Sequence, residues 1–393
     1  LGSVTQELLT FTRGRAVMRR LLRSPGVAAV LAHQNANLRK AIALEFTALR
    51  AGSHPRYYDA MQAYRRTLVE ALDTNDATLQ SLLGGAPLQS YSWLDDLKLT
   101  FGAHDVYDGL GSVWRHLAKD WTADGESAQA DLRRYICSIV SAECARLRAA
   151  SVVIPGCGQG RLAYDIACVL PDDASVIGIE RSPAQLAIAR HFLPVHVDAM
   201  EEPAALPFHP WLDAFTNNLH PTSRAARLIA RRPTTADDKA RPPPPSLTMI
   251  EGDFTALFST PLSASSAHEE HDVCVTSFFM DCLDDLAEGV RAVHQSLRPG
   301  GLWVFAGPLH FGQGGGGGLR PSPTLEQLLT LVQESGFALE AADRSAPPSG
   351  AGGQVEGALP VGVEMVHAPY VARPGAFLLE ADWTVPLFAA RRV

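Results

Sequence analysis

SVVIPGCGQGRLAYDI, residues 151–166, joins an apolar run to an amphipathic run through three alternate glycines, Gly156, Gly158 and Gly160. This order predicts a β-strand, a tight turn and a helix. Glycines let the backbone of such a turn approach a ligand closely, so turns of this kind hold phosphates, dinucleotides or other adenosine-containing ligands. The stretch predicts a ligand site and leaves the ligand open.

The composition is that of a soluble globular protein. The 393 residues are 46% hydrophobic, the mean hydropathy is +0.01 and the formal net charge is −8. A mildly acidic chain without a long basic run argues against general binding of nucleic acid or of anionic membranes. No apolar stretch approaches the ~20 residues of a membrane-spanning helix.

The six cysteines form no CxxC pair, and several stand inside apolar runs. We interpret them as buried free thiols of a reducing compartment, which predicts the cytoplasm, with the nucleus as an alternative. The chain begins at Leu1, and residues 11–24 carry five arginines. A basic helix face is the favoured interpretation of these arginines, and the remnant of a transit peptide is the alternative.

The hydrophobic pattern changes near residue 150. Residues 1–150 show helical spacing, as in LRKAIALEFTAL, and predict an all-helical N-terminal region. From residue 151 to residue 393, apolar strand-like runs alternate with helical runs. This alternation predicts an α/β domain whose parallel sheet is covered on both faces and binds ligands beyond the carboxyl ends of its strands.

Three segments depart from that alternation. Residues 198–246, which end in RPPPPS, are interpreted as an insertion between two strands, and residues 312–318 and 346–353 as glycine-rich mobile loops. The final stretch, residues 377–393, alternates like a last pair of strands.

The glycine spacing narrows the ligand. The dinucleotide fingerprint is G-x-G-x-x-G, whereas this turn reads G-x-G-x-G with Arg161 in place of the third fingerprint glycine. The turn instead resembles the first motif of class I S-adenosylmethionine-dependent methyltransferases, which implies a seven-stranded Rossmann-like sheet. In that fold Glu180, after the second strand, accepts hydrogen bonds from the ribose hydroxyls. Asp253 binds the adenine amine, with Phe254 against the ring.

Each of these features has an alternative interpretation. The glycines would also serve a packing turn, Glu180 a helix cap, and Asp253 an ordinary turn. Their correct order and spacing together favour the cofactor site. An NAD-dependent dehydrogenase is disfavoured by Arg161 and by the sequence GDF at 252–254.

Longer stretches carry a narrower resemblance. They are PGCGQGRLAYDIA at the glycine turn, HLAKDWTADGE at 116–126, PWLDAFTNN at 210–218, SFFMD at 277–281 and LRPGGLWVFAGPLHF at 297–311. Together with GDF they resemble the carnosine N-methyltransferase family, from about residue 50 to the C-terminus. The resemblance implies S-adenosylmethionine as the cofactor, and it assigns cofactor binding to Gly156, Gly158, Glu180, Asp253, Phe254 and Val273.

The same resemblance extends the cofactor site into the N-terminal region. On the HLAKDW helix the family directs a glutamine and an arginine toward the methionine carboxylate, and these positions are His116 and Lys119 here. Lysine keeps the charge of arginine but loses its bidentate fork, which predicts weaker cofactor binding. The last part of residues 1–150 thereby completes the site.

Three positions are implied for the methyl acceptor. Asp281 matches an imidazole-binding aspartate, and capping the helix that begins near Asp284 is its alternative. His310 matches a substrate-contacting histidine, with a packed or exposed histidine as the alternative. Trp383 stands where the family has a tyrosine, so it would stack on the imidazole without a hydroxyl, or belong to the core.

The implied reaction is methyl transfer to an imidazole ring nitrogen of carnosine, giving anserine, or of a related histidine-containing peptide. Asp281 would accept the hydrogen bond from the N–H nitrogen and take the departing proton. No cluster has metal-ligand spacing, so no metal is expected. A protein histidine or another small amine is the alternative substrate, and a non-catalytic binding module is disfavoured because the glycine turn and its acid are intact. The resemblance also implies a homodimer through the helical region.

Overall fold

The computed structural model describes residues 27–47, 49, 54–83, 110–193, 205–216, 218–233, 247–258, 271–311, 322–341, 359–371, 373 and 382–393. The arginine-rich stretch at 11–24, RPPPPS and the two glycine-rich loops lie outside these residues. Within them, no helix is long and apolar enough to cross a membrane. All six cysteines are free thiols, as predicted, but the predicted burial holds for three of them, and the other three are partly exposed.

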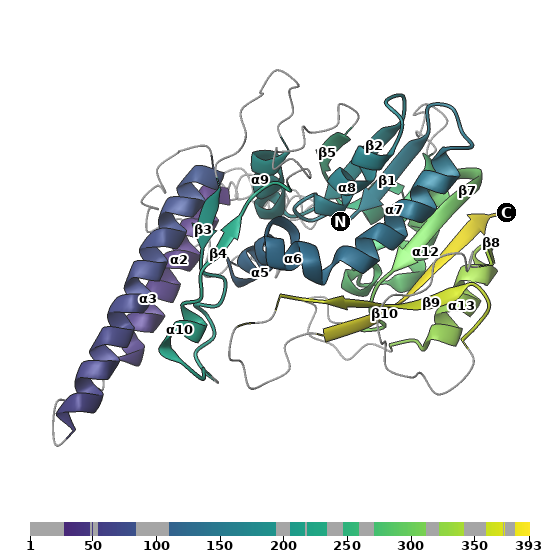
Figure 1. Ribbon diagram of the computed structural model, residues 1–393. Helices are drawn as coiled ribbons and strands as arrows, with labels where there is room; N and C mark the ends of the chain where they lie inside the picture. Colours follow the sequence, from purple (N-terminus) through teal and green to yellow (C-terminus); the bar gives the residue numbers. More distant parts are fainter. Residues whose placement is uncertain are drawn as a thin grey trace, which may run out of the picture.

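A central sheet organises the chain (Figure 1). Its path runs β5-β2-β1-β6-β7-β10-β8, in which β10 is antiparallel to both neighbours and the strands from β5 to β7 are parallel. Counted along the chain, the order is 3-2-1-4-5-7-6, the topology of class I methyltransferases that the sequence predicts. The bounds are β1 Ser151–Pro155, β2 Ser175–Glu180, β5 Leu247–Glu251, β6 His271–Ser277, β7 Leu297–Ala306, β8 Phe337–Leu339 and β10 Asp382–Arg392.

Two details of the sheet differ from the prediction. An eighth strand, β9 (Val363–Pro369), pairs with β10 outside the seven-strand path. The described part of the predicted last strand pair, residues 382–393, forms one strand of 11 residues, and the rest of that prediction lies outside the described residues. The cause is that β10 is long enough to pair with β9 along Asp382–Phe388 and with β8 along Ala390–Arg392. β10 therefore pairs with β7 along one edge and with both β8 and β9 along the other.

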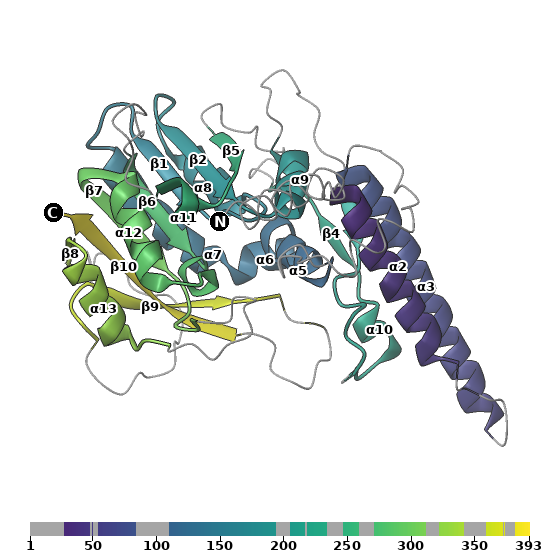
Figure 2. The ribbon, with the colours of Figure 1, turned by 180° about the vertical axis from the view of Figure 1, so that it is seen from behind.

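Helices cover both faces of the sheet, and alternate residues of each strand point to opposite cores. Val152, Ile154 and Val273 belong to the core under α7 (Ala130–Cys144) and α8 (Arg161–Val169), which lie in front of the sheet in Figure 1. Val153, Cys274 and Trp303 belong to the core on the other face, which Figure 2 shows. The helices there are α11 Phe254–Phe258, α12 Leu286–Ser296 and α13 Leu325–Glu334.

The described part of residues 1–150 is helical, as predicted. Helices α2 (Val27–Glu45) and α3 (Pro55–Leu82) form a hairpin that projects from the body (Figure 1), and α5 (Leu110–Trp121) and α6 (Ala123–Ala128) follow. Helix α7 packs directly on the sheet through Leu132, Ile136 and Val140. The last helix of the region therefore belongs to the core of the sheet, and the predicted domain division at residue 150 stays a prediction.

The described part of the insertion packs against the helical hairpin. It holds a two-stranded antiparallel sheet, β3 (Leu206–Phe208) and β4 (Leu228–Ala230), and the short helix α10 (Pro221–Arg224). Asn75 of α3 donates to the carbonyl of His209 at 3.0 Å and accepts from its backbone N–H at 2.8 Å. This reciprocal pair fixes the insertion where it borders α5.

Candidate active site

The glycine turn between β1 and α8 requires glycine at all three positions. Gly156, Gly158 and Gly160 have φ values of 58°, 56° and 81°, in the left-handed region that L side chains avoid. A Cβ on Gly156 would stand 2.3 Å from the Phe279 ring, whereas a Cβ on Gly158 would meet no atom within 4 Å. The turn therefore leaves open space beside Gly158, where a ligand can approach the backbone.

Glu180 holds this turn from the end of β2. Its carboxylate accepts hydrogen bonds from the backbone N–H of Gly158 at 2.8 Å and of Ser182 at 2.7 Å. Burial raises the pKa of Glu180 above its ordinary value, and these backbone donors oppose the shift. Ser182, not Glu180, is the N-cap of α9 (Pro183–Phe192), so the helix-cap interpretation of Glu180 is wrong.

Asp253 and Phe254 follow the carboxyl end of β5, whose last residue, Glu251, pairs with Glu180 in the sheet. Asp253 accepts from the Thr255 hydroxyl at 2.7 Å and the Ala256 N–H at 3.2 Å, so in the protein alone it serves the turn that starts α11. Its side chain is 41% exposed, which leaves it accessible to a ligand. Phe254 is 2% exposed and packs against Phe258 and Phe279 in the core. The adenine roles of both residues stay predictions.

Hydrogen bonds attach α5 to the glycine turn. The Trp121 indole donates to the carbonyl of Gln159 at 3.2 Å, and the Gln159 amide donates to the carbonyl of Val113 at 3.0 Å. Arg161 donates to the carbonyl of Asp120 at 2.9 Å and forms an ion pair with Asp165 at 3.0 Å. The residue that breaks the dinucleotide fingerprint thus joins the helical region to the turn.

His116 and Lys119 lie on α5, near Tyr370. Burial, followed by the charge of Lys119, lowers the pKa of His116 to about 4, so the ring is neutral at pH 7. Its Nδ1–H donates to the carbonyl of Ser112 at 2.8 Å. Nε2 is then an acceptor, which suits an ammonium group and not the carboxylate that the family's glutamine faces.

Lys119 remains a cation in the same region. Burial lowers its pKa, but interactions led by the charge of the Asp120 carboxylate outweigh burial, so the net pKa of Lys119 is raised. Its Nζ lies 3.3 Å from the Asp120 carboxylate and 5.7 Å from the centre of the Tyr370 ring. This placement is consistent with an ammonium group that binds an anionic group of a ligand.

Val273 does not join the other predicted cofactor residues. It is fully buried in the core and pairs with Val152 and Leu302, well before the carboxyl end of β6 at Ser277. The ligand edge of a parallel sheet is formed by the carboxyl ends of its strands. The structure thus places Val273 apart from the ligand edge, and its contact with the cofactor stays a prediction.

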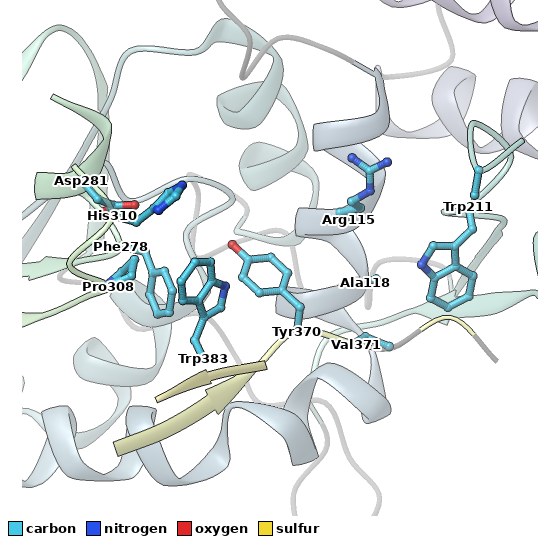
Figure 3. A pocket seen from close by; sticks show the side chains of 11 residues that line it. Arg115, Ala118, Trp211, Phe278, Asp281, Pro308, His310, Tyr370, Val371 and Trp383 are labelled. Atoms are coloured by element: carbon cyan, nitrogen blue, oxygen red, sulfur yellow. The ribbon is translucent and has the colours of Figure 1, made fainter. Parts of the chain in front are cut away.

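A cavity of about 490 Å³ lies at the same edge of the sheet (Figure 3). Its walls come from α5, the insertion, the loops after β6 and β7, the end of β9 and the start of β10. The lining residues are Arg115, Ala118, Trp211, Ala214, Phe278, Asp281, Pro308, His310, Tyr370, Val371 and Trp383. The three residues predicted to bind the methyl acceptor, Asp281, His310 and Trp383, therefore lie in the wall of one cavity.

Asp281 occupies the 3₁₀ turn η2 (Met280–Cys282) that follows β6. One of its carboxylate oxygens is buried and has no hydrogen-bond partner among the described residues. Burial raises the pKa of Asp281 to about 6. The cap of α12 is Asp285, which accepts from the N–H groups of Ala287 and Glu288, so the cap interpretation of Asp281 is wrong.

The segment after β6 begins with a strained backbone conformation at Phe278. Phe278 has a φ of 50°, which costs a bulky residue ~1–2 kcal/mol, and its N–H donates to the carbonyl of Ala306 at 2.9 Å. The neighbouring Phe279 ring covers Gly156. The chain after β6 therefore connects the glycine turn to the cavity that holds Asp281.

His310 and Trp383 lie side by side in the cavity wall, with ring centres 5.9 Å apart. His310 is exposed, whereas Trp383 is half-buried and also packs against the core of the sheet. Tyr370, at the end of β9, stands beside them with its hydroxyl in the cavity (Figure 3). The sequence gives no signal for Tyr370, because only the pairing of β9 with β10 brings it here.

The strand order, the glycine turn with its acid, and the cavity at the carboxyl edge define a protein with the class I methyltransferase fold. A family model described as "Carnosine N-methyltransferase" matches residues 102–347. The chain belongs to this family. Within the described residues, no group of three or more His, Cys, Asp or Glu side chains is placed to hold a metal ion.

Curated relatives agree with the family. "Carnosine N-methyltransferase unmet" of Drosophila melanogaster is 28% identical over 63% of this chain and 52% of its own length. "Carnosine N-methyltransferase" of Rattus norvegicus is 24% identical over 59% and 55%, and that of Schizosaccharomyces pombe 22% over 68% and 72%. The chain spans about half the length of the first two.

A solved S-adenosylmethionine-dependent methyltransferase from Mesorhizobium loti is 19% identical over 64% of this chain and 96% of its own, with a TM-score of 0.32. That score is low, and the strand order of the chain itself defines the fold.

Proposed function

We propose that this chain is an S-adenosylmethionine-dependent methyltransferase that acts on an imidazole ring nitrogen of carnosine, giving anserine, or of a related histidine-containing peptide. The observation that carries the proposal is a buried carboxylate oxygen of Asp281, without a partner among the described residues, in a cavity with aromatic walls. Burying a hydrogen-bond acceptor without a donor costs free energy, and a ligand N–H that donates to it recovers that free energy. An imidazole offers that N–H on a flat ring that matches Phe278, Tyr370 and Trp383.

The residues at the sheet edge fit the proposed cofactor. The space beside Gly158 would be filled by any Cβ, and Glu180 places a carboxylate next to it. Lys119 offers a cation and His116 a neutral acceptor for the two charged groups of a methionine moiety. When bound, S-adenosylmethionine supplies an electrophilic methyl group.

The chain's own contribution is orientation and proton handling. Asp281 accepts a hydrogen bond from one ring N–H and so selects the tautomer whose other nitrogen carries the free lone pair. The carboxylate stabilises the positive charge that the methylated ring acquires, and then accepts its proton. With a pKa of about 6, Asp281 is largely ionised at pH 7 and still basic enough to take that proton.

The cavity also supports a small acceptor. A space of about 490 Å³ is the usual size for a small-molecule site. Family membership and the free thiols support an enzyme that works on a cytoplasmic small peptide.

The test is incubation of the purified chain with S-adenosylmethionine and carnosine, followed by mass spectrometry. We expect a product heavier by one methyl group, with fragmentation placing the methyl on the imidazole. A parallel incubation with a whole proteome tests protein histidine as the acceptor. Methylated protein without methylated dipeptide, or no methylated product in either incubation, would contradict the proposal.

A further inference from the structure

The two ends of the cavity carry opposite charges. Asp281 and His310 lie at one end and Arg115 at the other, with Tyr370 between them (Figure 3). Among the described lining residues, Arg115 carries the one guanidinium or ammonium group. A ligand that fills the cavity therefore meets a carboxylate at one end and a cation at the other.

Arg115 is held in place by the insertion. Its Nη2 donates to Oδ2 of Asp213 at 2.6 Å. Gly111, one helical turn earlier on α5, permits this approach, because a Cβ there would lie 2.5 Å from the same oxygen. The Arg115 side chain stays 49% exposed, and its other N–H groups have no hydrogen-bond partner among the described residues. The guanidinium is thus oriented in advance with donors to spare.

We propose that Arg115 binds the α-carboxylate of the acceptor and makes the enzyme selective for imidazole compounds that carry one. This inference rests on the proposed function, which places the imidazole ring at Asp281. The α-carboxylate of a histidine residue is repelled by Asp281 and attracted by Arg115. Guanidinium groups bind carboxylates through paired N–H donors, so Arg115 fixes the direction in which the peptide lies.

A different role for Arg115 would be to hold the methionine carboxylate of the cofactor. Lys119 stands four residues later on the same helix and is engaged by Asp120 at 3.3 Å. Lys119 is not among the residues that line the cavity, whereas Arg115 is. This difference assigns Lys119 to the cofactor side and Arg115 to the acceptor side.

The experiment compares carnosine with β-alanylhistamine, which has the same imidazole and amine but lacks the carboxylate. We expect the wild-type kcat/KM to be ~10–100-fold higher for carnosine, the range of one charge-assisted contact. Arg115→Gln should lose that preference by weakening carnosine alone, and Arg115→Lys should keep part of it. Calorimetry should give an unchanged cofactor Kd in both variants.

The matched control is Arg134→Gln, which removes an exposed arginine that pairs with Asp131 on α7, outside the cavity. This variant should leave kcat/KM unchanged for both substrates. Equal loss on both substrates, no loss on carnosine, or weaker cofactor binding in Arg115→Gln would overturn the role of Arg115 while methylation by the wild type still stands. If the wild type methylates neither compound, the proposed function fails and this inference with it.

Discussion

The glycine turn and the acceptor cavity are neighbours at one edge of the sheet, but they are built differently. The turn is held by backbone groups, with Glu180 accepting from Gly158 and Ser182. The cavity is lined by side chains from six separate segments and contains a carboxylate oxygen that has no partner in the part of the chain that the structure describes. The hydrogen bonds of the turn form without a ligand, whereas the cavity holds a strong hydrogen-bond acceptor that is available to a ligand. Changes at the two places should therefore have separable effects.

The largest effect is expected from Asp281→Asn. The amide keeps the size of the carboxylate but cannot take a proton, so turnover on carnosine should fall by ~10²–10⁴-fold. Cofactor binding, measured by calorimetry, should change little because Asp281 belongs to the cavity and not to the turn. Turnover like that of the wild type would remove Asp281 from the mechanism.

A smaller effect, on cofactor binding instead of turnover, is expected from Glu180→Gln. Loss of the charged acceptor at the turn should weaken cofactor binding by ~10–100-fold in calorimetry, the range of hydrogen bonds to charged groups. The control is Glu251→Gln, since Glu251 is the exposed register partner of Glu180 at the end of β5. Similar losses in both variants would show that a general charge effect, and not the turn, is responsible.

The smallest effect concerns stability. A pKa raised to about 6 means that ionised Asp281 destabilises the fold, with a cost absent near pH 4 and complete above about pH 6. Asp281→Asn should therefore be more stable than the wild type by roughly 1–2 kcal/mol at pH 7.5, with the gain disappearing at pH 4. Urea unfolding at both pH values measures it. A stability gain that does not depend on pH would show that ionisation of the Asp281 carboxylate is not its cause.

The comparison also explains which features could be predicted from the sequence. The turn and Glu180 depend on residues close in sequence, so their order is visible in it. The position of Val273 in the middle of β6 could not be predicted in the same way, because a strand pattern does not show how far along a strand the ligand edge lies. Tyr370 and Arg115 gave no signal, since β9, the insertion and α5 bring them to the cavity only through tertiary packing.

The sequence by itself determined the alternation of strands and helices, the glycine turn, its acid and the family resemblance. These depend on local periodicity and on backbone conformations that only glycine adopts readily. The tertiary structure decided that Asp281 is a cavity carboxylate and not a helix cap, with one oxygen unpartnered among the described residues. It also decided that His116 is neutral and that Arg115 faces Asp281 across one cavity. Burial and charge depend on residues distant in sequence, so folding had to place them before the chemistry became visible.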